Sequence, residues 1–184
     1  MTRVVAVCGS RRDGSYTRVA LGHALDAASE AGAETDLLDL GAVDLPLYHP
    51  DVDIEEQGEA AALVARIREA DGVLLGSPVY HGSYSSTFRN FHDYCGFDEY
   101  EDTVVGLLAT AGGGSYGSTL DHMRATVRGV HGWVVPHQVG IRRAYDQFDA
   151  DGAFVDPALE ERVAELGRVV VERARDRAAP RASD

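Results

Sequence analysis

A nine-residue segment near the N-terminus carries residue types that bind an anion. Gly9–Thr17 reads GSRRDGSYT and follows a short apolar run, Arg3–Cys8, that is typical of a buried strand. A helical pattern begins after it, and free N–H groups at a helix N-terminus favour negative charge. The segment contains three aliphatic hydroxyls, two glycines and two arginines, whereas a simple helix cap would need only Ser15. This composition predicts a phosphate-binding loop.

The pattern of this loop limits the kind of phosphate compound. A Walker loop requires the lysine of GxxxxGK[ST], and the chain contains no lysine. The dinucleotide pattern GxGxxG occurs only later, at Gly112–Gly117, in the fourth strand–helix unit rather than the first. About 20 residues further on, the chain has Trp133 instead of an acidic residue for the ribose. We therefore interpret this second segment as a glycine-rich loop that lets backbone amides approach a flat ring.

A third segment, Ser77–Tyr84, follows another apolar run and reads SPVYHGSY. Pro78 keeps the preceding serine extended beyond the strand, and Gly82 allows a turn into the next helix. Tyr80 and its neighbouring amides could then border and stack on a planar ring. An ordinary strand–helix connection with a packed tyrosine is the alternative that this segment leaves open.

The elements that must position these segments alternate along the chain. Apolar runs predict five strands, at Arg3–Cys8, Glu34–Leu40, Gly72–Ser77, Thr103–Thr110 and Trp133–Val139. Helical periods predict five helices, at Tyr16–Ala31, Gly58–Ala70, Ser83–Cys95, Ser115–Val130 and Pro157–Ala178. We expect an α/β domain over residues 1–178, with a parallel sheet covered by helices on both faces and a frayed tail at 179–184. Ligands of such sheets bind beyond the carboxyl ends of the strands, where the three segments lie.

The charge balance excludes two classes of partner. The 184 residues include 17 basic and 30 acidic side chains, for a net charge of −13. Such a surface repels nucleic acid and anionic membranes, so we expect neither as a partner. The acidic excess without lysine also indicates a halophilic protein, because concentrated salt screens self-repulsion. A GC-rich genome would explain the missing lysine, but not the acidic excess.

The chain shows no sign of secretion, membrane insertion or metal binding. No apolar run approaches the roughly 20 residues that span a bilayer, and the N-terminus has no signal-peptide layout. Cys8 and Cys95 lack the spacing of a metal or redox motif, so we expect reduced thiols and a cytoplasmic protein. The histidines have no paired ligand spacing, and Asp146–Gly152 departs from the calcium-loop pattern, so we expect no metal site.

Two motifs carry a family resemblance. They are Gly9-Ser10-x-Arg12-x-x-Ser15 and Ser77-Pro78-x-Tyr80-x-Gly82-Ser83, and the second continues to Arg89-Asn90-x-x-Asp93-Tyr94. Together they resemble the NADPH-dependent FMN reductase family of flavodoxin-like proteins, and the resemblance covers nearly the whole chain. It implies a flavodoxin-like three-layer sandwich with strand order 2-1-3-4-5.

The resemblance also implies which residues bind the cofactor FMN. Its phosphate would be surrounded by Ser10, Arg12, Ser15, Tyr16 and Thr17. Its ring and ribityl chain would be lined by Pro78, Val79, Tyr80, His81 and Gly82. The polar edge of the ring would be closed over by Ala111, Gly112, Gly113, Gly114, Tyr116 and Gly117.

The implied activity is that of an FMN-dependent NAD(P)H oxidoreductase. Electrons from NADPH or NADH would pass through bound FMN to a small acceptor, such as a quinone, an azo compound, a metal oxyanion or free flavin. Members of the family are usually homodimers or homotetramers. A flavodoxin-like electron carrier without NAD(P)H turnover and a flavin-free binding module are the alternatives from other classes. Because the cofactor supplies the reactivity, no firm catalytic side chain is expected.

The chain departs from the family at the predicted ring-facing loop. The family often has glutamate at position 79 and asparagine at position 81, where this chain has Val79 and His81. These differences would affect the acceptor and the flavin potential. His81 beside a flavin could act as a proton donor to a reduced acceptor. The alternative is a loop histidine held only by its backbone.

Overall fold

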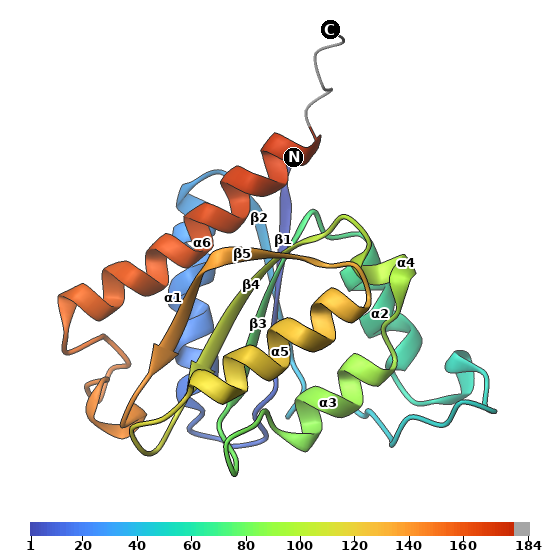
Figure 1. The fold of residues 1–184 in the computed structure, drawn as a ribbon, viewed down its shortest axis with the longest axis horizontal. Helices are drawn as coiled ribbons and strands as arrows, with labels where there is room; N and C mark the ends of the chain where they lie inside the picture. The colour runs from blue at the N-terminus through green and yellow to red at the C-terminus, as the bar shows by residue number, and fades with distance from the viewer. Residues whose placement is uncertain (179–184) are drawn as a thin grey trace, which may run out of the picture.

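The structure, a computed structural model, describes residues 1–178, and the predicted tail at 179–184 lies outside the described residues. Five parallel strands form one sheet in the order β2-β1-β3-β4-β5. The strands are β1 (Arg3–Cys8), β2 (Glu34–Asp39), β3 (Gly72–Pro78), β4 (Val104–Thr110) and β5 (Trp133–Ile141). The predicted strand order is confirmed, and the carboxyl ends of the strands point toward the bottom of Figure 1.

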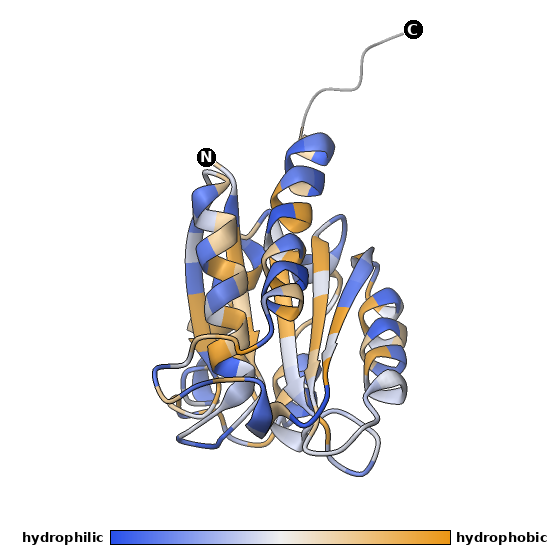
Figure 2. Cartoon of the chain, turned by 90° about the vertical axis from the view of Figure 1, so that its left-hand side faces the viewer, coloured by the Kyte–Doolittle hydropathy of each residue, from blue (hydrophilic) through white to orange (hydrophobic). Residues whose placement is uncertain are grey.

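Helices cover both faces of this sheet. They are α1 (Tyr16–Glu30), α2 (Ala60–Arg68), α3 (Ser86–Asp93), α4 (Phe97–Tyr100), α5 (Gly117–Gly129) and α6 (Pro157–Ala178). Figure 1 shows α1 and α6 on one side and the other four on the opposite side, and each set packs on its own apolar core. Figure 2 shows hydrophobic strands between helices whose outer faces are mostly hydrophilic. The predicted three-layer architecture is confirmed. No helix of residues 1–178 has the length and apolar character to cross a membrane.

Glycines in the sheet and in α6 bring α1 close enough to shape the carboxyl edge. At Gly167 a Cβ would collide with the backbone of Ala24, so the two helices approach where a larger residue would separate them. At Gly76 in β3, a Cβ would lie 2.7 Å from Leu21 and 2.9 Å from Thr17. The first turn of α1 therefore lies directly on the end of β3.

The strand register brings three loops to one place. Cys8 pairs with Gly76 at the ends of β1 and β3, and Pro78 pairs with Thr110 at the ends of β3 and β4. Side chains that follow these strands must therefore leave the sheet beside one another. This is the arrangement that the sequence predicted from the parallel topology.

The helix bounds differ from the prediction by up to three residues, as at α2, which spans Ala60–Arg68 rather than Gly58–Ala70. The third helix begins at Ser86 rather than Ser83, because Ser85 is its N-cap and its Oγ accepts the Phe88 N–H at 3.0 Å. The helix after β4 begins at Gly117 rather than Ser115. Finally, α4 was not predicted, and its first turn is closed by the Glu99 carboxylate, which accepts the Gly96 N–H at 2.7 Å.

Candidate functional site

A cavity of about 340 Å³ lies at the carboxyl edge of the sheet, where the loops after β1, β3, β4 and β5 meet. Ten residues predicted to bind the cofactor line it: Ser10, Arg12, Ser15, Tyr16, Thr17, Pro78, Val79, Tyr80, Ala111 and Gly112. The other six predicted positions lie outside its lining: His81, Gly82, Gly113, Gly114, Tyr116 and Gly117. The cavity thus brings together part of each of the three segments.

The N-terminus of α1 supplies hydrogen-bond donors to this cavity. Ser15 is the N-cap, and its Oγ accepts the Arg18 N–H at 3.2 Å. The N–H groups of Tyr16 and Thr17 have no partner within residues 1–178, as expected for the first turn of a helix. These two donors and the helix dipole favour an anion at this point. Ser15 therefore fills the cap role, while the backbone beside it remains available for a ligand.

Two hydroxyl groups fix the shape of the phosphate-loop backbone. Ser10 is 3% exposed, and its Oγ accepts the Arg12 N–H at 3.3 Å. The hydroxyls of Thr17 and Thr110 lie 2.5 Å apart, which joins α1 to the end of β4. These contacts hold the loop between β1 and the first turn of α1 before any ligand arrives.

The arginines around this loop divide into committed and free groups. Arg18 forms an ion pair with Asp39 at 2.7 Å and also donates to the carbonyl oxygen of Asp13. Arg11 and Arg12 form no ion pair within residues 1–178, and only Arg12 lines the cavity. Its guanidinium is therefore a planar, charged donor without a competing carboxylate.

The loop after β3 is tied to the phosphate loop by a pair of serines. Ser77 Oγ accepts the Ser85 N–H at 2.9 Å, and Ser85 Oγ in turn donates to the Gly9 carbonyl oxygen at 2.5 Å. All three residues are buried. These hydrogen bonds join residues that directly precede the cavity-lining residues Ser10 and Pro78, so they fix the two loops relative to each other.

His81 lies at the tip of a tight turn after β3. The N–H groups of Tyr80 and Ser83 each bond to the other residue's carbonyl oxygen, at 2.9 and 3.0 Å. Both residues between them have positive φ, 51° at His81 and 78° at Gly82. His81 is exposed there and does not line the cavity. Its role as a proton donor stays a prediction, and the backbone-held turn matches the alternative.

The glycine-rich loop after β4 is anchored at both ends to the chain that follows β5. Ala111 donates to the Ile141 carbonyl oxygen at 2.8 Å, and the Arg143 N–H donates to that of Gly113 at 3.0 Å. A Cβ added at 112, 113 or 114 would have no atom within 4 Å. The loop backbone is therefore open to close approach by a flat group.

Three lining residues were missed by the sequence reasoning: Thr110, Ala144 and Tyr145. Tyr145 is 54% exposed and Tyr80 is 53% exposed, so the cavity has two accessible phenol rings. Ala144 and Tyr145 follow β5, whose carboxyl end reaches the same edge as the others. Applying the edge rule to the fifth strand as well would have found them.

The surroundings of Cys8, at the end of β1, do not favour a reactive thiol. It is fully buried, and burial raises the pKa of its thiol. Its Sγ lies 3.8 Å from Ser15 Oγ. A buried thiol with a raised pKa is a poor nucleophile and metal ligand. Among residues 1–178, no group of three or more histidines, cysteines and carboxylates is placed to hold a metal ion.

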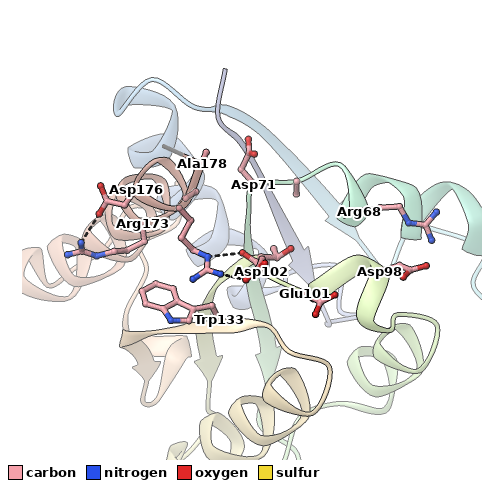
Figure 3. A pocket seen from close by; sticks show the side chains of 13 residues that line it. Arg68, Asp71, Asp98, Glu101, Asp102, Trp133, Arg173, Asp176 and Ala178 are labelled. Carbon is pink, nitrogen blue, oxygen red and sulfur yellow. Dashed lines mark hydrogen bonds and ion pairs between the residues drawn. The ribbon is translucent and has the colours of Figure 1, made fainter. Parts of the chain in front are cut away.

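A larger cavity, of about 600 Å³, lies at the opposite, amino edge of the sheet. It is bordered by Asp71, Thr103 and Trp133, which lie just before or at the starts of β3, β4 and β5. Figure 3 shows Asp102 and Trp133 near each other in this cavity. The Arg177 guanidinium pairs with the Asp102 carboxylate and lies over the Trp133 ring, 5.6 Å from its centroid. Its three arginines are each paired with a carboxylate, Arg68 with Glu99, Arg173 with Asp176 and Arg177 with Asp102. Because of this, and because ligands of such sheets bind at the carboxyl edge, we do not assign the cofactor there.

A parallel sheet of order 2-1-3-4-5 with a cavity at its β1/β3 switch point is the arrangement of the flavodoxin-like class. Within this class, the model of the NADPH-dependent FMN reductases matches residues 2–146, and the chain belongs to that family. It is accordingly an oxidoreductase that uses FMN and NADPH.

Similar proteins agree with this assignment. The chain is 32% identical over 165 residues to an NADPH azoreductase of Bacillus sp. (strain OY1-2), which covers 89% of this chain and 90% of that protein. It is 28% identical over 176 residues to a probable NADPH:quinone oxidoreductase 1 of Oryza sativa subsp. japonica, covering 89% and 87%. A flavoenzyme NAD(P)H:(acceptor) oxidoreductase from Paracoccus denitrificans has the same fold, with a TM-score of 0.80, 20% identity and coverage of 96% and 98%.

The residues of the cavity fit FMN. The unpartnered N–H groups of Tyr16 and Thr17, with the free guanidinium of Arg12, match a phosphate group. The open backbone of 112–114 leaves space beside the polar edge of a flat ring.

Proposed function

We propose that the cavity at the carboxyl edge holds FMN, with the phosphate on the loop from Ser10 to Thr17 and the ring between the loops after β3 and β4. The observation that supports this proposal most strongly is the pair of unpartnered N–H groups at the start of α1, beside the uncommitted Arg12. Buried hydrogen bonds join Ser77 to Ser85 and Ser85 to Gly9, and they tie the loop after β3 to the start of the loop that carries Arg12. FMN, when bound, supplies the two-electron redox chemistry.

The chain's own part is to position the cofactor and stabilise charge. Backbone N–H groups of the loop at 112–114 would border the polar edge of the ring, where a reduced flavin carries negative charge. Pro78 and Val79 would form one side of the ring site, and the Val79 N–H is fixed by the Thr110 carbonyl oxygen at 2.9 Å. Four of the predicted cofactor-binding residues do not line the cavity and would lie at its border: His81, Gly82, Tyr116 and Gly117.

We further propose that the acceptor is a planar aromatic compound of the azo or quinone type. Tyr80 and Tyr145 expose phenol rings at the cavity, and such rings stack on aromatic ligands. Relatives of the chain are named NADPH azoreductase and probable NADPH:quinone oxidoreductase. A pure electron carrier would need neither an NADPH site nor an acceptor site.

Spectra and NADPH turnover test the cofactor site. The purified protein is expected to show the absorbance of bound FMN and to oxidise NADPH with a quinone or azo dye as acceptor. Arg12→Gln should weaken FMN binding about tenfold or more, because a charge-assisted hydrogen bond contributes about 1.5–3 kcal/mol. Arg11→Gln is the control: it removes the same charge from the neighbouring position, which does not line the cavity. Equal FMN affinity in both variants would count against the assigned phosphate site.

Finer properties are also proposals. We propose that residues 1–178 act as one domain of a cytoplasmic, halophilic homodimer or homotetramer. The net charge of −13 supports a preference for salt, and the two free, buried cysteines suit a reducing compartment. Leu47 is 85% exposed, as an apolar residue at a subunit contact would be in the separate chain. Light scattering at low and high salt would report both the assembly and its salt dependence.

A further inference from the structure

A second cavity, of about 360 Å³, adjoins the candidate FMN site on the side of β5. Three of its lining residues are arginines, at Arg142, Arg143 and Arg162, while Asp156 is its only acidic lining residue. This is a local excess of positive charge on a chain whose net charge is −13. The composition of the cavity therefore favours an anionic ligand.

The arginines of this second cavity are available for such a ligand. Within residues 1–178, the guanidinium groups of Arg142 and Arg162 have no ion-pair or hydrogen-bond partner, and that of Arg143 comes no closer than 4.0 Å to Asp146. The carboxylate of Asp156 accepts the Ala158 N–H at 2.9 Å at the start of α6, and the three guanidinium groups outnumber this one carboxylate. Elsewhere on the chain most arginines are committed, as Arg66 is to Asp36 at 2.5 Å.

The local backbone holds two of these arginines in position. Gly140 leaves room for the ring of Tyr116 to lie against β5, where a Cβ would collide with it. The guanidinium of Arg142 lies over that ring, 5.7 Å from its centroid. Arg143 has a positive φ of 41°, and its N–H is bonded to the Gly113 carbonyl oxygen at 3.0 Å. The cationic groups are thus arranged before a ligand binds.

The second cavity is next to the place where a nicotinamide must react. Ala144 and Tyr145 line the candidate FMN site, and Arg142 and Arg143 line the second cavity. Adjacent Cα atoms are about 3.8 Å apart, so one short segment forms a wall of both cavities. A dinucleotide with its nicotinamide over the FMN site can therefore place its adenosine end beside these arginines.

We propose that the second cavity binds the 2′-phosphate of NADPH, and that Arg142 and Arg162 select NADPH over NADH. This proposal rests on the proposed FMN site, since it is the flavin that fixes where the nicotinamide lies. A phosphate monoester carries about −1.5 to −2 charges at neutral pH and is matched by the planar donors of arginine. NADH has a hydroxyl at that position and gains nothing comparable from the arginines.

Steady-state kinetics with both donors test the proposal. Arg142→Gln and Arg162→Gln should each raise KM for NADPH, because each removes a charge-assisted hydrogen bond. In the double variant the rise should be about tenfold to a hundredfold. KM for NADH, kcat and the FMN content should stay as in the unsubstituted protein. Arg128→Gln is the charge-matched control, because Arg128 is exposed on the last turn of α5 and lines neither cavity. Equal rises in KM for NADPH and NADH would overturn the assignment.

A binding measurement separates this proposal from the cofactor site. Calorimetric titration with adenosine 2′,5′-bisphosphate should show binding that weakens in the double variant, whereas adenosine 5′-monophosphate should bind equally to both proteins. That result would support the arginine site whether or not the protein retained FMN. Failure to retain FMN would refute only the cofactor assignment. If the bisphosphate bound no better than the monophosphate, the 2′-phosphate site would be refuted while FMN binding and NADPH oxidation stood.

Discussion

Replacement of Ser85 by alanine should destabilise the fold and loosen the candidate site together. The Ser85 side chain is 3% exposed and makes two hydrogen bonds: it accepts the Phe88 N–H at 3.0 Å and donates to the Gly9 carbonyl oxygen at 2.5 Å. Loss of an N-cap serine costs about 1 kcal/mol. Leaving the buried Gly9 carbonyl without its partner costs about 1–3 kcal/mol more. The Ser85→Ala variant should therefore lose about 2–4 kcal/mol in the free energy of unfolding, because it loses its hydrogen bonds to both Gly9 and Phe88.

Urea unfolding measures this loss. Both proteins are compared after removal of FMN, because a ligand of the folded state adds to the apparent stability by an amount that depends on its affinity. The midpoint should fall while the slope with urea stays constant. Ser86→Ala is the matched control, since Ser86 is exposed on the first turn of α3 and its hydroxyl has no partner within residues 1–178. If Ser85→Ala and Ser86→Ala lowered the stability equally, the claim that Ser85 joins the two loops would be wrong.

Two further perturbations follow from packing and from burial. Gly167→Ala should destabilise the protein by about 1–3 kcal/mol, because the added Cβ would collide with the backbone of Ala24. Gly22→Ala, in open space on α1, should stabilise it by about 0.5–1 kcal/mol. The melting temperatures of the two variants should therefore shift in opposite directions. Burial lowers the pKa of His92 below its ordinary value near 6.5, so the unfolded chain binds a proton that the folded chain does not, and stability falls as the pH drops below about 6.5. His92→Phe should reduce that fall between about pH 7.5 and pH 5.5 in urea titrations, and an unchanged dependence on pH would contradict the stated cause.

The sheet could be predicted from the sequence because its strands are buried on both faces. β1 and β3 appear as short, nearly continuous apolar runs, and their predicted bounds differ from the observed ones by at most one residue. The short helix α4 could not be predicted in this way. Its four residues are fewer than a helical period needs to show, and Glu99, which closes its first turn, is also held by Arg68 at 2.5 Å from α2.

The candidate site could be predicted where it depends on local sequence. Ser10, Arg12 and Ser15 are close together in the chain and line the cavity as expected. His81 was expected beside the ring from the family resemblance. Its left-handed backbone and the paired hydrogen bonds between its neighbours place it on an exposed turn outside the cavity lining. Tyr145 was missed for the opposite reason: its place depends on where β5 ends relative to four other strands, which no local pattern states.

The two proposed anion sites bear on the acidic surface as a whole. NADPH is itself an anion, so a protein with a net charge of −13 repels it at long range. The free arginines act only at contact, on the phosphate loop and beside Tyr116. In about 1 M salt the screening length falls to about 3 Å, which removes the long-range repulsion but leaves bidentate contacts largely intact. Salt should therefore weaken NADPH binding less in this protein than in a reductase that attracts NADPH through a basic surface. In this respect the acidic composition and the clustered arginines both favour activity at high salt.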